Sequence, residues 1–216
     1  MDTLDAIADR ILEALEAKTS VRETTLARSR KLIQHASRAI RAAHRLEFDE
    51  AAAILSQAEA IAAEMRDGAR AYPDVYAAGY TQDALKELAE ASIVLALMQD
   101  RPLPDPDELD IEYAAYLNGL GEAVGEMRRH VLDLIRRGDL ERAEVILEAM
   151  DDIYGVLVTI DFPSAITGGL RRTTDMVRGV TERTRGDLTM AVRQEKLQKA
   201  LKEFENRVEM WDQRSG

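Results

Sequence analysis

The sequence predicts an all-α protein, a bundle of about seven or eight helices in a single domain that covers residues 1–216. Three observations support this fold class. Alanine, leucine, glutamate and arginine, which favour helices, dominate the chain. Segments that alternate β-branched and polar residues, as strands do, are nearly absent. The breaks at glycine and proline are few and short, so none of them is long enough to separate two domains.

In the first half of the chain, residues that favour turns and caps mark the helix boundaries. Phe48-Asp49 provides a turn and an N-cap, and Gly68 and Pro73 mark the next break. The segment 101–106 cannot be helical because it contains three prolines, each without an amide donor. These breaks predict helices at about residues 2–17, 21–46, 49–67 and 80–99.

The second half divides at similar signals. Gly138 suits a helix C-terminus, and Asp139 suits the N-cap of the helix that follows. We expect Pro163 to open a helix that contains Gly168-Gly169, and Gly186-Asp187 to start the last one. The predicted helices cover about residues 107–137, 139–160, 163–185 and 186–211.

Composition excludes several classes of protein. A net charge of −11 argues against a nucleic-acid ligand unless the basic residues are segregated. The absence of cysteine excludes thiolate metal sites, and three histidines disfavour a multi-histidine zinc site. No stretch approaches the ~18 apolar residues of a membrane-spanning helix. The acidic N-terminus also lacks the layout of a signal peptide. We therefore expect a cytoplasmic protein without membrane contact.

The helix predicted at 21–46 concentrates basic residues on one face. At about 100° per residue, four of its arginines and one glutamine fall within about 80° of one another, and a lysine flanks them. Guanidinium groups match the geometry of phosphates and keep their charge, so the row suits a nucleic-acid backbone. The alternative is a solvated basic face offset by acidic neighbours. The row consists of Arg30, Gln34, Arg38, Arg41 and Arg45, with Lys31 beside it.

Two predicted helices each carry a pair of carboxylates. Glu87 and Glu90 are three residues apart, at the point where a polar stripe becomes apolar. Glu122 and Glu126 are four apart, next to glycines that allow another helix to approach. Together the pairs could form an oxygen-ligand site for Mg²⁺ or Mn²⁺. The alternative is coincidence, because 40 acidic residues produce many such pairs.

Three segments resemble motifs of the translin family, in particular those of its catalytic branch, translin-associated factor X. Residues 29–45 reproduce the spacing of that branch's basic helix, with Ser29-Arg30, Arg38, Ile40 and His44-Arg45. Residues 87–91, Glu-Leu-Ala-Glu-Ala, are similar to its E-x-x-E-A motif. Residues 116–126, Tyr-Leu-Asn-Gly-Leu-Gly-Glu-Ala-Val-Gly-Glu, are similar to its Y-L-x-G-x-x-D-x-x-G-E motif. The resemblance spans roughly residues 20–190 and points to an archaeal-type member of this branch.

The resemblance implies a metal-dependent endoribonuclease. It assigns catalysis to Glu87, Glu90 and Glu122, and Glu126 is the candidate fourth ligand of Mg²⁺, with Mn²⁺ as the substitute. Glu122 stands where the family has aspartate, so its side chain is one methylene longer. Translin subunits, which are regarded as inactive, have apolar residues in place of the first acid pair. Because this chain retains the acids, it resembles the active branch.

The resemblance also implies partners. The family forms hollow oligomers, typically octamers, that bind single-stranded RNA and DNA, so we expect a homo-oligomer of six to eight chains. The candidate nucleic-acid-binding residues lie on the basic helix and are Arg30, Lys31, Arg38, Arg41, His44 and Arg45. Two alternatives remain. One is a nucleic-acid-binding shell without catalysis, and the other is a helical scaffold that binds protein.

Overall fold

All regular structure in the computed structural model is helical over the residues that it describes, 2–215. Residues 1 and 216 of the predicted domain lie outside this range. The all-α prediction is therefore confirmed, with eight helices among the described residues. They are α1 (Asp2–His44), α2 (Phe48–Ala69), α3 (Pro73–Tyr76), α4 (Gly79–Met98), α5 (Tyr113–Arg137), α6 (Leu140–Thr159), α7 (Ser164–Thr167) and α8 (Leu170–Ser215).

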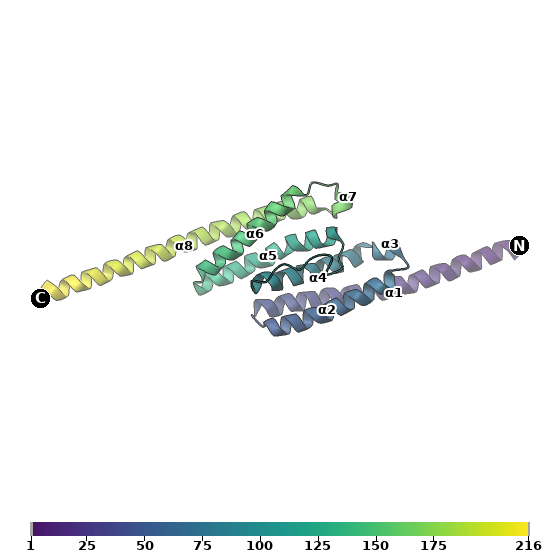
Figure 1. The fold of residues 1–216 in the computed structure, drawn as a ribbon, viewed down its shortest axis with the longest axis horizontal. Coiled ribbons are helices and arrows are strands. Elements are labelled where there is room, and N and C mark those ends of the chain that lie inside the picture. The colour runs from purple at the N-terminus through teal and green to yellow at the C-terminus, as the bar shows by residue number, and fades with distance from the viewer. Residues whose placement is uncertain (1, 216) are drawn as a thin grey trace.

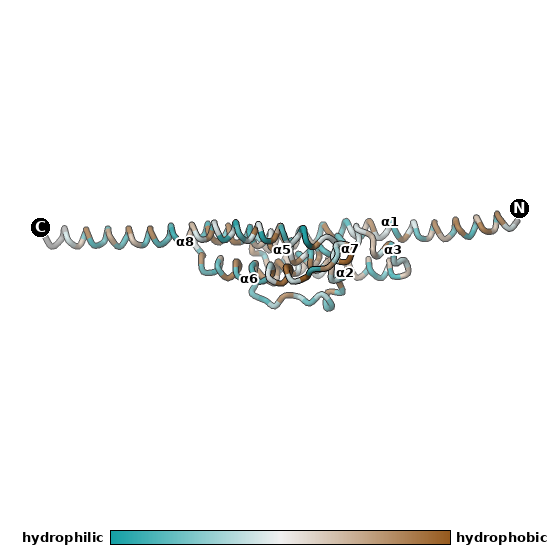
Figure 2. Tube along the Cα trace, turned by 90° about the horizontal axis from the view of Figure 1, so that it is seen from above, coloured by the Kyte–Doolittle hydropathy of each residue, from teal (hydrophilic) through white to brown (hydrophobic). Residues whose placement is uncertain are grey.

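The six longer helices pack in two layers. In the first layer α1, α4, α5 and α8 lie side by side in that order, each in contact with the next (Figure 1). In the second layer α2 packs on α1 and α4, while α6 packs on α5 and α8. In the view of Figure 2, α1 and α8 run along the upper side of the bundle, and α2 and α6 lie on the lower side. The apolar core fills the space between the two layers. The helices α4 and α5, in the middle of the first layer, contribute many of its side chains.

Helix α4 is the most enclosed element. Every residue from Leu88 to Ala96 is buried, on all sides of the helix. Eight of these nine residues are apolar or small, and the ninth is Glu90, which is only 8% exposed. Burying a carboxylate without a cation is unfavourable. Glu90 is therefore an exception within an otherwise apolar segment, and it indicates a functional site.

The predicted break near residues 18–20 is wrong, because α1 is a single helix of 43 residues. No glycine or proline lies between the two predicted segments. The hydroxyl groups of Thr24 and Thr25 instead donate to the carbonyl oxygens of Ser20 and Val21, at 3.0 and 2.8 Å. These bonds lie within the helix, so the threonines do not cap a new one.

The predicted start of the fifth helix at residue 107 is also wrong, because α5 begins at Tyr113. The proline-rich linker continues as a series of turns. The amide of Asp107 donates to Oδ1 of Asp105 at 2.7 Å, and the amide of Ile111 donates to the carbonyl of Pro106 at 3.0 Å. By contrast, the joint at residues 138–139 matches the prediction. Gly138 has φ 79°, and the Asp139 side chain accepts a hydrogen bond from the amide of Arg142.

The C-terminal part differs from the prediction at two glycine sites. Gly168 and Gly169 have φ of 61° and 84° and separate the single turn of α7 from α8, so they do not lie within a helix. Gly186, in contrast, does not interrupt α8, because an isolated glycine costs a helix only ~1 kcal/mol. Next to it, Arg128 of α5 pairs with Asp187 at 2.8 Å and ties α8 to the bundle at this point.

Both ends of the chain extend beyond the bundle. The first half of α1 and the last half of α8 project in opposite directions (Figure 1). We call them the N-terminal arm (residues 2–20) and the C-terminal arm (residues 190–215). Each carries exposed apolar side chains at helical spacing, including Leu4, Ile7, Ile11 and Leu15 in one and Leu197, Leu201, Phe204 and Val208 in the other. No helix in the described part of the chain is long and apolar enough to cross a membrane.

Candidate metal centre and nucleic-acid interface

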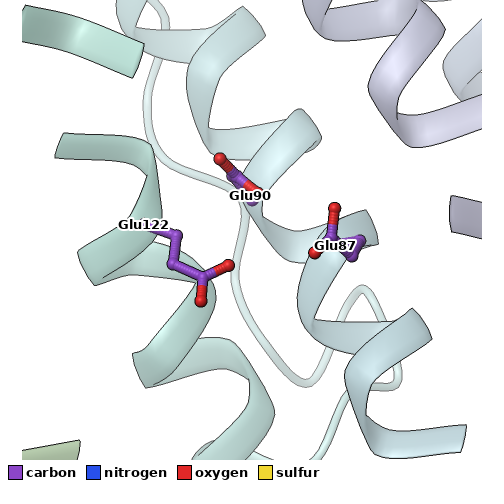
Figure 3. A group of neighbouring side chains, drawn as sticks. All are labelled: Glu87, Glu90 and Glu122. Carbon is purple, nitrogen blue, oxygen red and sulfur yellow. The ribbon is translucent and has the colours of Figure 1, made fainter. Parts of the chain in front are cut away.

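Three of the four predicted carboxylates converge between α4 and α5. Glu87 and Glu90 come from adjacent turns of α4, and Glu122 reaches toward them from α5 (Figure 3). One oxygen from each residue lies within 4.8 Å of the others. Oxygens bound to a single Mg²⁺ lie about 2.1 Å from it, and so at most about 4.2 Å apart. A small side-chain movement would therefore allow these three residues, the carboxylate cluster, to share one cation.

Glycines in α5 bring the two helices close enough to form this cluster. A Cβ atom on Gly119 would lie 2.7 Å from the carbonyl oxygen of Lys86 and 2.9 Å from Cβ of Ala89, so α5 lies directly against α4 here. A Cβ on Gly121 would overlap Thr173 of α8. Glu122 follows immediately, so its position is fixed by close contact on two sides. A Cβ on Gly125 would meet no atom within 4 Å, so this glycine is not needed for packing.

Without a cation, the cluster is electrostatically unfavourable. Burial raises the pKa of Glu90 to about 8, and the charges of Glu87, Glu122 and Glu126 contribute to the rise. Burial also raises the pKa of Glu87, although Lys86 partly offsets it. At neutral pH, Glu90 therefore holds a proton when no cation is bound. A divalent cation would favour the ionised form of these groups, so the donor set fits a hard cation that prefers oxygen.

Lys86 is part of the site and was missed from the sequence. Its Nζ lies 2.7 Å from Oε1 of Glu122 and 3.7 Å from Oε1 of Glu87. Burial lowers the pKa of Lys86, but the hydrogen bond to Glu122 and the nearby carboxylates outweigh it, and the net pKa is raised. In the sequence, the sign that Lys86 belongs to the site is its position next to Glu87. That position alone does not reveal a contact with a residue 36 positions away on another helix.

Glu126, the predicted fourth ligand, lies outside the carboxylate cluster. Its Oε2 is 2.6 Å from Nε2 of His44, at the end of α1. This hydrogen bond lowers the pKa of Glu126, against the opposing effect of burial. The structure therefore places Glu126 beside the cluster, where its charge affects Glu90, with its own partner already in place.

Of the six candidate nucleic-acid-binding residues, five are exposed and one is buried. Arg30, Lys31, Arg38, Arg41 and Arg45 are exposed along α1, whereas the His44 side chain is only 3% exposed. Arg45 pairs with Glu47 at 2.5 Å and with Glu50 at 3.5 Å. For the other four exposed residues, no ion pair forms within the described residues. Arg41 lies one turn before His44 on α1, so this end of the basic row lies next to the turn that contacts Glu126.

Two further arginines lie near the cluster and were not predicted. Arg129 is exposed on α5, one turn beyond Glu126. Arg172 lies at the start of α8 and lines a groove of about 830 Å³ between α4, α5 and α8. Lys86 and Glu122 line the same groove, and exposed Ile166 and Met176 add apolar surface. The groove therefore leads from Glu122 along a surface that combines the cations Lys86 and Arg172 with apolar groups and one further acid, Asp83.

Solved structures show which proteins share this fold. The chain is 33% identical to AfC3PO, a C3PO of the translin family, with a TM-score of 0.79. The match covers 85% of this chain and 96% of the AfC3PO chain. The chain belongs to the translin family. A structure of an AfC3PO complex with duplex RNA matches at 32% identity and a TM-score of 0.75, over 85% of this chain and 95% of that one.

Two other comparisons extend the translin-family match. Apo-NeC3PO, at 20% identity, shows the same fold with a TM-score of 0.74 over 88% of this chain and 98% of that one. An uncharacterised protein of Methanocaldococcus jannaschii is 29% identical over 195 residues, which is 89% of this chain and 86% of the relative. No family model matches the sequence. In this translin-family chain, the three glutamates to which the family resemblance assigned catalysis are the ones that the fold gathers.

Proposed function

We propose that this translin-family protein is a metal-dependent endoribonuclease that acts as a hollow homo-oligomer. The observation that carries the proposal is the convergence of Glu87, Glu90 and Glu122, with Glu90 buried in a segment of α4 whose other residues, from Leu88 to Ala96, are apolar or small. An uncompensated carboxylate in such a place destabilises the fold. A bound cation would offset that cost, and phosphodiester hydrolysis is a chemistry that such a cation supports.

Binding of RNA is supported by two independent features. AfC3PO, which is 32% identical over most of the chain, has been solved in complex with duplex RNA. On this chain, Arg30, Arg38 and Arg41 are exposed and have no ion pair within the described residues. We infer that they contact the phosphates of the strand and give little base specificity. The sequence favoured single-stranded RNA, with single-stranded DNA as a second ligand, and the AfC3PO complex adds duplex RNA to the substrates to be tested.

The chemistry assigns a distinct part to each group. Glu87, Glu90 and Glu122 would hold Mg²⁺ or Mn²⁺, and the bound ion would supply an activated water and positive charge beside the phosphate. In the hydrolysis that such a site would support, a water oxygen would add to phosphorus, one P–O ester bond would break, and the leaving oxygen would take up a proton. Arg41 and Arg129, which lie one turn from His44 and from Glu126, would hold neighbouring phosphates. These contacts keep the scissile bond in place.

Assembly is supported by the two arms. Each arm exposes an apolar stripe that the bundle of the same chain does not cover, and such surfaces mark protein interfaces. We propose six to eight chains, as the family resemblance implies, with contacts made through the arms. The absence of cysteine is compatible with the reducing cytoplasm, which we propose as the location.

Purified protein incubated with labelled RNA tests the function. Single-stranded and duplex RNA of the same sequence are compared in Mg²⁺, in Mn²⁺ and in EDTA. Cleavage with either metal and none in EDTA supports the nuclease. Binding without cleavage under every condition would favour the alternative, a nucleic-acid-binding shell, and failure to bind RNA would favour a helical scaffold.

A further inference from the structure

Lys86 lies where a metal ion would interact with the cluster. Its ammonium contacts Oε1 of Glu122 at 2.7 Å and is 3.7 Å from Oε1 of Glu87. Both glutamates belong to the carboxylate cluster that would bind the cation. The Lys86 side chain is 21% exposed, so solvent screens this contact only partly. In this structure, Lys86 is the counter-ion of two of the three proposed ligands.

A divalent cation in the cluster conflicts with this position. A cation bound to Glu122 at about 2.1 Å would lie within a few ångströms of the ammonium. Two positive groups so close repel each other strongly in a half-buried site. A cation bound to the same carboxylates therefore weakens both contacts of Lys86 and favours movement of the ammonium away from the cluster.

The structure provides a place for the displaced side chain. Lys86 lines the groove that leads away from the cluster toward Arg172. Its four-carbon stem can rotate without moving α4, because the ammonium is at the free end of the chain. From the groove, the ammonium would remain next to a phosphate held at the cluster and could contact its oxygens.

We propose that Lys86 exchanges between two anionic partners. Without a metal it neutralises Glu122 and Glu87, and with a metal in the cluster it turns into the groove and binds the phosphate of the RNA strand next to the cleaved bond. The inference rests on the proposed function, since it requires a divalent cation at the cluster. Lys86 would then lower the affinity for the metal, because it competes for the same carboxylates. It would also raise the rate of cleavage, because it binds the phosphate.

The first half of the proposal is the competition between Lys86 and the metal. Calorimetric titration of the protein with Mn²⁺, without RNA, tests it. Lys86→Met removes the competing charge and should bind Mn²⁺ about tenfold more tightly than the wild type. Lys86→Arg keeps the charge and should stay near the wild-type affinity. Lys18→Met, which breaks a surface ion pair with Asp74 far from the cluster, is the matched control and should change nothing. Unchanged or weaker Mn²⁺ binding by Lys86→Met would overturn the exchange.

The second half of the proposal is the contact between Lys86 and the RNA phosphate. The rate of RNA cleavage at saturating Mn²⁺ tests it. Lys86→Met should cut RNA at least tenfold more slowly despite its tighter metal binding, because the phosphate loses a cationic partner. If this variant binds Mn²⁺ more tightly and cleaves at the wild-type rate, Lys86 is only a counter-ion, and the phosphate contact is refuted. If the wild type itself binds no Mn²⁺, the metal centre fails, and the exchange fails with it.

A measurement on the wild type avoids dependence on any variant. Lysines are acetylated with a limiting amount of reagent and identified by mass spectrometry, in EDTA and in Mn²⁺. The ion-paired Lys86 should react slowly in EDTA and several-fold faster in Mn²⁺, while Lys18 should react equally in both. Equal reactivity of Lys86 in a protein that binds Mn²⁺ would contradict the exchange.

Discussion

Nε2 of His44 lies 2.6 Å from Oε2 of Glu126, so the last turn of α1 is joined to the middle of α5 beside the carboxylate cluster. The contact couples the helix that carries the basic row to a helix that contributes to the cluster. It gives Nε2 of His44 and Oε2 of Glu126 a partner, whereas Nδ1 of His44 is buried without a hydrogen-bond partner among the described residues. His44 has little exposure for contact with RNA, and Glu126 has a partner other than a metal.

We predict that His44 stabilises the fold more than it binds RNA. His44→Ala should lower the free energy of unfolding by about 2 kcal/mol, because it leaves the half-buried Glu126 carboxylate without a partner. Urea denaturation measures this loss, and Glu126→Gln, whose amide can still contact His44, should lose less. If His44→Ala leaves stability unchanged but weakens RNA binding, the original assignment of His44 to the nucleic-acid interface is correct.

We predict that Glu87 and Glu90 are required for cleavage and not for binding. The Glu87→Gln, Glu90→Gln double variant keeps the shape of the site but removes the charges that hold the cation, so Mg²⁺-dependent cleavage should fall by at least a factor of about 100. RNA affinity, measured by filter binding, should stay the same or rise, because repulsion of the phosphate is relieved. Glu141→Gln, Glu144→Gln is the matched control, an exposed acid pair with the same spacing on α6. Wild-type cleavage by the cluster variant would refute the catalytic assignment.

We predict that Glu90 makes the metal-free protein less stable as pH rises. Its pKa is raised to about 8, against 4.5 for an ordinary glutamate. Between these values the folded protein binds more protons than the unfolded chain, so the free energy of unfolding falls with increasing pH. Glu90→Gln does not titrate. In EDTA, its stability advantage over the wild type should therefore grow by roughly 1–3 kcal/mol from pH 5 to pH 8. A constant difference across that range would show that Glu90 titrates normally.

We predict that the exposed arginines of α1 bind phosphates. The Arg38→Ala, Arg41→Ala double variant should weaken binding whatever the RNA sequence and should reduce the slope of log affinity against log salt by about 1.4, at about 0.7 per phosphate contact. Arg45→Ala should have a smaller effect, because Glu47 and Glu50 already pair with that side chain. Arg70→Ala, at an exposed arginine that directly follows α2, is the control. An unchanged slope would place the RNA elsewhere.

We predict that the C-terminal arm is an assembly interface. Leu201→Glu, Phe204→Glu places charge on its apolar stripe and should convert the oligomer to smaller species in native mass spectrometry. The control is Asn206→Glu, on the opposite face of the same arm. Retention of the full oligomer by the double variant would show that the stripe serves another purpose.

The sequence was most informative where the determinants were local. The spacing of Glu87 and Glu90 places both on one face of a helix wherever that helix packs, and the helix joint at Gly138 depends on only two residues. The family resemblance then linked this pair to Glu122. Contacts between distant helices were inaccessible, since no periodicity shows that Lys86 meets Glu122 or that His44 meets Glu126.

The errors in helix boundaries share a physical cause. Whether a glycine or a group of polar residues interrupts a helix depends on what holds the flanking turns. Gly186 lies within a helix that Arg128 fastens to the bundle through Asp187, so continuity costs little. Gly168 and Gly169 are adjacent and adopt left-handed backbone angles, so the chain turns there. From the sequence we expected a helix through Gly168-Gly169 and a break at Gly186, and the structure shows the reverse at both sites.

The two arms give every chain two separate attachment points that face in opposite directions (Figure 1). If an arm of one subunit contacts a different surface of the next subunit, the contact is head-to-tail. Such contacts close into a ring only if the rotation from one subunit to the next divides a full circle, and otherwise continue as a filament. The described side chains of the arms are almost all exposed, and most of the stability of a helix in a protein comes from tertiary packing. Subunits that have not joined their neighbours should therefore be cut by proteases at both ends, so the appearance of trimmed bundles would report how much of the protein is unassembled.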